Sequence, residues 1–296
     1  MKPPPSSCLL LAPLALLVVV LVLPSLRPPQ VVSDWSGGGV LCAHNATTNA
    51  AAVAPPQDEP ELISLLIGVL TTPNRRERRD ILRLAYALQP RATGARVDVR
   101  FVFCNVTDPV DAALVAVEAR RHGDILVLNC TENMNDGKTH TYLSAVPRLF
   151  ASDPYGYVMK ADDDTYLRVA ALAEELLGKP REDVYLGSGF PVGDDPMPFM
   201  HGMGYVVSWD VAEWVSGNAE ILRRNDTHGH EDRLLGKGRN RYDLKPRMYD
   251  LHWDVDGFRP DTVAVHRLKD NRRWAAAFRY FNVTAGIKPS DLYHLP

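Results

Sequence analysis

From Glu61 onward the sequence alternates between short apolar runs and segments with helical periodicity, and this alternation restricts the fold more than any other feature. Four apolar runs, each followed by an amphipathic segment, occur in a row: LISLLIGVL, VDVRFVFC, DILVLN and YGYVMKA. Nearly continuous apolar character indicates strands buried on both faces, as in a largely parallel sheet that helices cover on either side. The pattern predicts an α/β fold in which ligands bind beyond the carboxyl ends of the strands. Beyond these pairs, GYVVS predicts one more strand, leading into a helix at WDVAEWVSG.

Composition excludes one broad class of function. The 296-residue chain has 33 Lys and Arg against 36 Asp and Glu, and a net charge of -3 gives no field strong enough to neutralise nucleic-acid phosphates. Four cysteines are too few to build a fold from disulfides, so the core must be hydrophobic. We therefore expect no nucleic-acid partner, and a single catalytic-size domain with an appendage.

A run of sixteen apolar residues without a charge, from Cys8 to Leu23, predicts membrane targeting. The run is shorter than the ~20 residues that span an average bilayer, but a short anchor suits the thin membranes of the early secretory pathway. Because no clean small-x-small cleavage site follows, we expect an uncleaved signal anchor over residues 8–26, behind a cytoplasmic tail of residues 1–7. A cleaved, secreted form is the alternative.

The sequence after the anchor has the marks of a lumenal protein. Residues 27–60 are rich in Pro, Ala, Gly and Thr, a composition typical of a flexible stem, and the catalytic domain is expected over residues 61–296. Chance predicts about one Asn-x-Thr glycosylation site in a chain of this composition. The sequence has five, at Asn45, Asn105, Asn129, Asn225 and Asn282.

Three cysteines, Cys42, Cys104 and Cys130, lie beyond the apolar run, in what would be an oxidising compartment. Cys104 and Cys130 each follow a predicted strand and can pair with one another. Cys42 would then be free, or would bridge two chains through their stems. Three unpaired thiols are the alternative.

Three consecutive acids, Asp162, Asp163 and Asp164, follow the fourth predicted strand. In an extended segment the first and third side chains point the same way, and their repulsion is costly unless a cation neutralises them. Hard oxygen ligands suit Mg²⁺ or Mn²⁺, ions that keep open positions for substrate phosphates. The alternative is a solvated turn in which Asp164 or Thr165 caps a helix that begins near residue 167.

Spacing eliminates several rival motifs. A phosphatase signature needs Thr or Val at position 166, where Tyr166 stands, and a Walker motif needs a glycine at position 132, where Glu132 stands. The sequence contains neither HExxH nor GxSxG. A metal-dependent phosphoesterase that uses the acidic triplet also lacks a recognisable nucleophile or second-metal cluster.

The segment YVMKADDDTYL resembles the Lys-x-Asp-Asp-Asp signature of the β1,3-galactosyltransferase family, glycosyltransferase family 31. Other segments are similar to blocks of that family in the same order: LLIGVLTTPNRRERRDILRLAY, HGDILVLNCTENMNDGKTHTYLSAVPRLF, FMHGMGYVVSWD, GHEDRLLG and VHRLKDNRRW. The resemblance covers roughly residues 61 to 275 and is closest to plant-type members.

The resemblance implies a GT-A type, Rossmann-like domain held in the Golgi membrane as a single-pass type II protein. It implies a hexosyltransferase that moves galactose from UDP-galactose, with inversion and with Mn²⁺ or Mg²⁺, into a β1,3 linkage on a glycan or glycoprotein acceptor. The C-terminal third would then form the acceptor side. A transferase that uses UDP-N-acetylglucosamine and a catalytically silent glycan-binding relative remain open.

The resemblance also assigns roles to residues near the acidic triplet. Asp164 matches the metal-binding acid, and His266 matches the late histidine that completes the coordination, a ligand that favours Mn²⁺ over Mg²⁺. Asp162 and Asp163 would position the ribose and the sugar of the donor. Arg79 and Lys160 are further candidates for the donor site.

The catalytic base is expected in HEDRLLG, at Asp232, with the adjacent Glu231 as the alternative. Arg233 stands where the family has valine, and a cation there would lower the pKa of the base. The segment EDVYLG matches the same block in letters but follows the triplet too closely, so we assign Asp183 a structural role. Arg79 belongs to a run that is more often a solvated helix face; the run is Arg75, Arg76, Arg78, Arg79 and Arg83.

Overall fold

The structure is a computed structural model that describes residues 63–133, 137–192, 194–218, 235, 240–251 and 257–285. All of these residues belong to one compact unit, Gln57–Pro296. The expected tail, anchor and stem lie outside the described residues and stay predictions. Within the described part of the chain, no helix is both long enough and apolar enough to cross a membrane.

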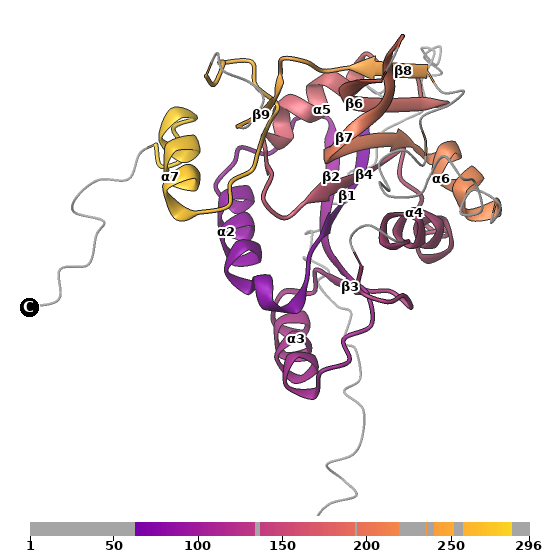
Figure 1. Cartoon of the computed structure of the whole chain (residues 1–296), viewed down its shortest axis with the longest axis vertical. Coiled ribbons are helices and arrows are strands. Elements are labelled where there is room, and N and C mark those ends of the chain that lie inside the picture. The colour runs from indigo at the N-terminus through magenta and orange to yellow at the C-terminus, as the bar shows by residue number, and fades with distance from the viewer. Residues whose placement is uncertain are drawn as a thin grey trace, which may run out of the picture. The chain divides into compact units, whose positions relative to one another are not determined.

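Four parallel strands form the first half of the central sheet (Figure 1). They are β1 (Ile63–Leu70), β2 (Ala95–Phe103), β3 (Ile125–Val127) and β4 (Tyr157–Asp162), in the order β3-β2-β1-β4. The connections hold the 3-10 turn η2 (Pro73–Arg75) and the helices α2 (Arg76–Ala87), α3 (Pro109–His122) and α4 (Lys138–Leu149). The β-α alternation predicted from the sequence is confirmed, with α5 (Val169–Leu177) as the fourth helix.

The expectation of a largely parallel sheet is confirmed, with one exception in the second half of the sheet. β7 (Asp195–Ser208) runs antiparallel to both β4 and β6 (Val184–Val192), and β8 (Asn240–Asp243) closes the order β3-β2-β1-β4-β7-β6-β8. β6 and β7 follow one another with too few residues between them for a crossover, so they must pair antiparallel. The predicted strand GYVVS is the end of β7, and α6 (Trp209–Gly217) follows it as expected.

A small second sheet follows the acidic triplet directly. It has the order β5-β10-β9, from β5 (Tyr166–Leu167), β10 (Ala264–His266) and β9 (Met248–Asp250), and α7 (Asn271–Tyr280) follows β10. β5 pairs antiparallel with β10, and β10 pairs parallel with β9. This sheet brings the C-terminal part of the chain against the carboxyl end of β4.

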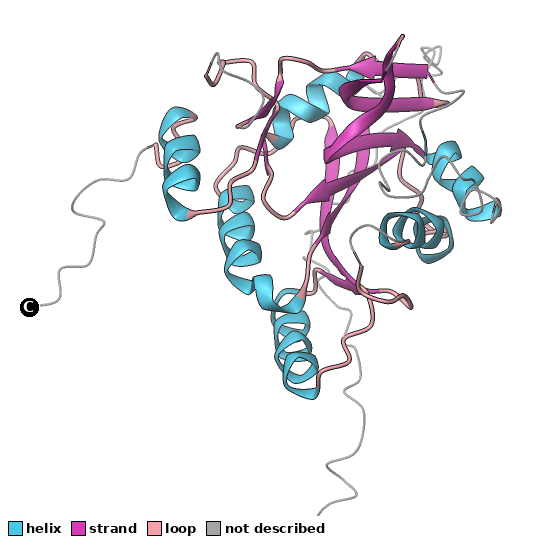
Figure 2. Ribbon diagram, in the orientation of Figure 1, coloured by secondary structure: helices cyan, strands magenta, loops and turns pink. Residues whose placement is uncertain are grey.

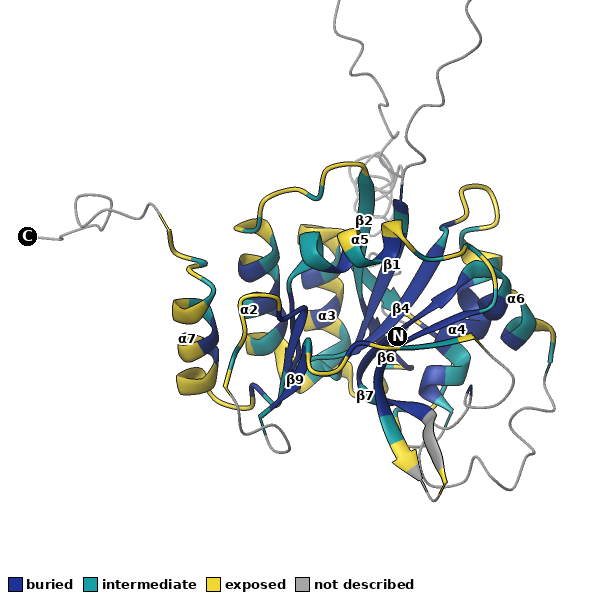
Figure 3. Cartoon of the chain, turned by 90° about the horizontal axis from the view of Figure 1, so that it is seen from above, coloured by how far each residue is buried: buried dark blue, intermediate teal, exposed yellow. Residues whose placement is uncertain are grey.

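Two hydrophobic cores lie on opposite faces of the central sheet, because successive residues of a buried strand point to opposite sides. Leu65, Ile67 and Val69 of β1 pack in the core that includes residues of α2, α3, α5 and α7, whereas Leu66 and Leu70 pack with α4 and α6. Figure 2 shows α4 and α6 on the side away from α2. Figure 3 shows the buried strands between helices whose exposed faces point outward. The expected double cover is confirmed.

Gly68 of β1 permits the close packing of α4 on the sheet. A Cβ atom at this position would lie 2.1 Å from the ring of Tyr142, so any residue other than glycine would force the ring to move. Tyr142 is fully buried, and its hydroxyl donates to the backbone oxygen of Met159 in β4. The small residue in the strand therefore fixes how near α4 lies to the carboxyl end of the sheet.

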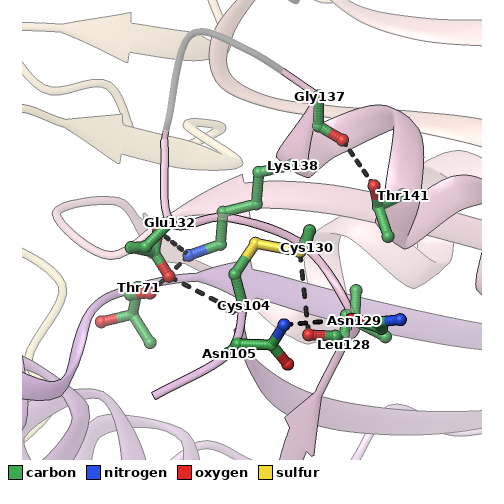
Figure 4. Close-up of a disulfide and its surroundings, with 10 residues drawn as sticks. All are labelled: Thr71, Cys104, Asn105, Leu128, Asn129, Cys130, Glu132, Gly137, Lys138 and Thr141. Atoms are coloured by element: carbon green, nitrogen blue, oxygen red, sulfur yellow. Dashed lines mark hydrogen bonds and ion pairs between the residues drawn. A yellow bond between two sulfur atoms is a disulfide. The ribbon is translucent and has the colours of Figure 1, made fainter. Parts of the chain in front are cut away.

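A disulfide joins Cys104, directly after β2, to Cys130, in the loop after β3 (Figure 4). The predicted pairing of these two cysteines is confirmed, and Cys42 lies outside the described residues. The backbone N–H of Cys104 donates to Glu132, whose carboxylate also accepts from the buried ammonium of Lys138 at 2.5 Å. Lys138 in turn donates to the backbone oxygen of Thr71 at the end of β1, at 2.6 Å.

Candidate active site

Asp162, Asp164 and His266 meet where β4 ends beside β10. One ligand atom from each lies within 4.8 Å of the others. The Nε2 atom of His266 is 3.2 Å from Oδ1 of Asp164 and 3.6 Å from Oδ2 of Asp162. The structure thus brings together Asp164 and His266, as the sequence predicts. It adds Asp162 to this group, a residue for which the family resemblance predicts a contact with the donor.

The three acids of the triplet divide between two sides, as the alternation of side chains predicts. Asp163 points away from His266 and accepts hydrogen bonds from Thr71 Oγ1 at 2.8 Å and from Arg78 at 2.6 Å. Thr71 follows β1, and Arg78 lies in the first turns of α2. Asp163 is therefore held at the edge of the cluster by the neighbouring strand and helix.

The alternative of a helix-capping acid is wrong. Residues 166 and 167 form β5 instead of a helix, because they pair with β10, and α5 begins only at Val169 with Arg168 as its N-cap. Thr165 Oγ1 donates to the backbone oxygen of Met203 in β7, so it caps nothing. The backbone oxygen of Asp164 accepts from Leu268, directly after the strand that carries His266.

Lys160 lies within the site, and its ammonium donates hydrogen bonds to other groups of the protein. It donates to Asp162 Oδ1 at 2.8 Å and to the backbone oxygen of Gly202 at 2.5 Å. Burial alone would raise the pKa of Asp162, but the Lys160 charge and the contact with His266 lower it to about 2. Lys160 thus holds Asp162 ionised, and the structure gives it a contact with the triplet where the sequence suggested the donor.

Asp250, at the end of β9, is a site residue that the sequence did not reveal. Its Oδ2 atom lies 2.7 Å from Nδ1 of His266, on the side of the ring away from the triplet. Burial opposes the charged imidazolium, but contacts with Asp162, Asp164 and Asp250 raise the pKa of His266 to about 10. Asp250 belongs to no motif, and only the parallel pairing of β9 with β10 places it opposite His266.

The donor set of this cluster fits a divalent cation. Two carboxylates and one imidazole nitrogen are ligands that Mn²⁺ accepts, and Mg²⁺ accepts the carboxylates. Asp162, Asp164 and Asp250 carry three negative charges, against two positive charges on Lys160 and Arg267, whose Nε donates to Asp250 at 2.9 Å. The imidazolium of His266 supplies the third positive charge, and a cation that binds Nε2 would displace the proton of that nitrogen.

Arg79 has a structural contact in place of the expected approach to a donor. Its side chain is 1% exposed, and Nε and Nη2 donate to the two carboxylate oxygens of Glu118 in α3 at 2.8 and 2.7 Å. Further N–H groups donate to the backbone oxygens of Thr72 and Pro73. Arg78, one position earlier, reaches the triplet, because consecutive residues of a helix point in directions about 100° apart.

The structure does not describe some of the residues that the sequence singles out. Asp232, Glu231, Arg233, Asn45 and Asn225 lie outside the described residues, so the expected catalytic base stays a prediction.

The remaining glycosylation sites are all exposed. Asn105 and Asn129 flank the disulfide, and the amide of the first donates to the second at 3.0 Å; Asn282 follows α7. Asp183 precedes β6, which is parallel to β4, so it lies at the opposite edge of the sheet from the triplet. That position agrees with a structural role.

Comparison with known proteins points to one family. The galactosyltransferase family matches residues 77–195, which include the acidic triplet. The β1,3-galactosyltransferase pvg3 of Schizosaccharomyces pombe is 26% identical over 69% of this chain and 71% of its own length. β1,3-galactosyltransferase 6 of Mus musculus is 25% identical over 65% of this chain and 64% of its own length. A probable β1,3-galactosyltransferase 4 of Arabidopsis thaliana is 28% identical over 58% of this chain, but only 48% of the relative is spanned.

Solved structures give a weaker likeness. A crystal structure of the galactosyltransferase LgtC with donor and acceptor sugar analogues covers 77% of this chain and 98% of its own length. The TM-score is 0.46 and the identity 13%, a similarity too low to add to what the sheet topology and the sequence relatives establish.

Proposed function

The chain belongs to the galactosyltransferase family and is a hexosyltransferase, and on that premise we propose the reaction, the cofactor and the place of work. It transfers galactose from UDP-galactose, with inversion and in a metal-dependent manner, to a glycan or glycoprotein acceptor in a β1,3 linkage. The domain that does so is of the GT-A type. The observation that carries the proposal is the cluster of Asp162, Asp164 and His266 at the carboxyl end of β4, the edge where such sheets bind ligands.

Asp164 and His266 would hold a Mn²⁺ or Mg²⁺ ion, with Asp162 as a third protein ligand. When bound, such an ion supplies Lewis-acid stabilisation of the charge that develops on the diphosphate leaving group. The remaining positions of the ion would be open to phosphate oxygens, as is usual for these cations.

The neighbouring side chains support the donor. Arg78 and Thr71 fix the carboxylate of Asp163 at the rim of the cluster, where it can accept hydrogen bonds from ribose or sugar hydroxyls. Lys160 keeps Asp162 ionised, and Asp162 would share the positioning of the donor. Asp232, with Glu231 as the alternative, would remove the proton from the acceptor hydroxyl that attacks the sugar.

A donor other than UDP-galactose is the second candidate. A human acetylgalactosaminyl-O-glycosyl-glycoprotein β1,3-N-acetylglucosaminyltransferase is 29% identical over 40% of this chain. UDP-N-acetylglucosamine is therefore the donor to test against UDP-galactose, since a few pocket contacts decide between such sugars. A silent glycan-binding relative is disfavoured, because it would have no need for the buried acids gathered around His266.

We place the protein in the Golgi membrane as a single-pass type II protein with its catalytic domain in the lumen. The apolar segment of residues 8–26 would anchor it, between the tail of residues 1–7 and the stem of residues 27–60. The five glycosylation sites and the Cys104–Cys130 disulfide support an oxidising, glycosylating compartment.

Calorimetric titration of the full chain in mild detergent with each UDP-sugar, first with Mn²⁺ and then with a chelator, tests the proposal. Metal-dependent binding and turnover of UDP-galactose supports it as stated. The same result with UDP-N-acetylglucosamine alone would replace the donor. If a folded chain bound neither donor, the transferase activity would be refuted in favour of a silent relative.

A further inference from the structure

The imidazole of His266 is held between two kinds of carboxylate. Nε2 faces Asp162 and Asp164, at 3.6 and 3.2 Å, while Nδ1 is 2.7 Å from Oδ2 of Asp250. The two nitrogens point to roughly opposite sides of the ring, so Asp250 cannot reach the point where a ligand of Nε2 would lie. Asp250 is 4% exposed, which makes its contact with the ring a buried hydrogen bond.

From this geometry we infer that Asp250 is a positioning residue, which fixes the tautomer and orientation of His266 for a divalent cation. The carboxylate accepts a hydrogen bond from Nδ1–H, so Nε2 is the nitrogen left to coordinate a cation between the two acids. Carboxylates in this position on metal-ligating histidines raise ligand basicity and fix ring orientation. The inference rests on the proposed metal site and names a residue that none of the family motifs in the sequence contains.

Asp250 is itself fixed by its surroundings. Parallel pairing of β9 and β10 places it opposite His266 in the register of the small sheet. Arg267, the next residue after His266, donates from Nε to both oxygens of Asp250, at 2.9 and 3.2 Å. Arg267 has a φ of 66°, an uncommon left-handed conformation for a residue with a side chain. The backbone thus turns directly after His266, and the guanidinium returns to the carboxylate that holds the ring.

A double-mutant cycle on Mn²⁺ binding tests whether Asp250 acts through His266. The full chain, its Asp250→Asn and His266→Ala variants and the double variant would be titrated with Mn²⁺ alone, and free ion measured by electron paramagnetic resonance. We expect Asp250→Asn to weaken Mn²⁺ binding about tenfold, the lower end of the range for such partners. In the His266→Ala background the same substitution should have no effect, because the ring on which it acts is gone.

Two further variants keep the test decisive. Asp243→Asn changes an acid of β8 that accepts from the backbone N–H groups of Gly189 and Lys245, and it should leave Mn²⁺ affinity unchanged. If Asp250→Asn does not fold, Arg267→Gln removes a partner of Asp250 while keeping the acid. It should weaken Mn²⁺ binding a few-fold, and only while His266 is present.

The outcomes separate this inference from the proposed function. If the wild-type chain binds Mn²⁺ and loses it on Asp164→Ala but not on Asp250→Asn, the metal site stands and the role of Asp250 is refuted. An equal loss in the His266→Ala background would also refute it, since Asp250 would then act by another route. A folded wild-type chain that binds no Mn²⁺ would overturn the metal site, and the inference with it.

Discussion

The protein has two largely buried clusters of paired charges, the Arg79 cluster and the His266 cluster, and they differ in the groups that carry the positive charge. Around Arg79, the guanidinium groups of Arg79 and Arg83 face the carboxylates of Glu118 and Asp124, and Arg83 also pairs with Asp80. Around His266, three carboxylates face two fixed positive charges and an imidazole. Burial and ion pairing are common to both. The difference teaches that a cation site is marked by a positive charge that can leave. Guanidinium groups keep their protons, whereas an imidazolium between converging carboxylates can give up its proton to a metal ion.

The largest effect should come from removing the acid at the centre of the His266 cluster. Asp164→Ala deletes a proposed metal ligand, and we expect transfer to fall by about a thousandfold or more, since a metal ion contributes several kcal/mol of charge stabilisation. Steady-state release of UDP from the UDP-sugar measures it. Glu174→Gln, on the exposed face of α5, is the control and should leave the rate unchanged. An Asp164→Ala variant that transfers normally would remove the distinction between the clusters.

Breaking the Arg79 cluster should lower the stability of the fold and leave metal binding unchanged. Glu118→Gln leaves the buried guanidinium of Arg79 without its carboxylate, while Arg83 keeps Asp124, and we expect it to lower the free energy of unfolding by about 3 to 5 kcal/mol. Denaturant unfolding with Glu174→Gln as the matched control measures the loss. A Glu118→Gln variant with altered Mn²⁺ affinity and unchanged stability would reverse the roles assigned to the two clusters.

The contribution of Glu118 to the free energy of unfolding should depend on pH. Burial alone would raise the pKa of Glu118, but the hydrogen bonds and charges of Arg79 and Arg83 lower it from 4.5 to about 2. Because the pKa is lower in the folded state, the contribution of Glu118 is full above pH 4.5 and is lost as the pH falls toward 2. The difference in unfolding free energy between wild type and Glu118→Gln should therefore shrink over that window. A difference that stays constant from pH 6 to pH 2 would contradict this account.

An intermediate effect is expected where a buried ion pair contacts a residue of the site. Lys138 is fully buried, pairs with Glu132 and donates to the backbone oxygen of Thr71 (Figure 4). The hydroxyl of Thr71 donates to Asp163. Lys138→Met should lower unfolding free energy by about 3 kcal/mol and weaken donor binding a few-fold. Unfolding and calorimetric donor titration read the two effects separately. A loss of stability without any change in donor affinity would show that Thr71 keeps its place without Lys138.

The smallest effect should come from the rim. Arg78→Ala removes the guanidinium that orients Asp163, and we expect donor affinity to fall about tenfold, the range of one charge-assisted hydrogen bond. Mn²⁺ affinity should not change, because Asp163 faces away from His266. Arg76→Ala, on the exposed part of the same helix, is the control. Equal losses in both variants would indicate a general effect of positive charge instead of a specific contact.

Much of the fold followed from local pattern. The apolar runs and helical segments predicted β1 to β4 and their helices, and the strand ends predicted that Cys104 and Cys130 can pair. The antiparallel β7 was recognised only at its last residues, because the preceding Gly- and Pro-rich stretch has no strand periodicity. Likewise the sequence suggests a helix start where β5 lies, since two residues that pair with a distant strand have no strand periodicity of their own.

The sequence by itself determined which chemistry gathers at the end of β4: a triplet of acids whose first and third members face the same way. That follows from the alternation of side chains along an extended segment, a property of neighbouring residues alone. Only the tertiary structure decided that Arg78 and not Arg79 reaches the triplet, and that Asp250 holds His266. Those contacts join segments far apart in the chain, and their geometry depends on helix phase and on the register of the small sheet. A shift of one residue in the helix, or in the register of the small sheet, would bring different side chains into contact.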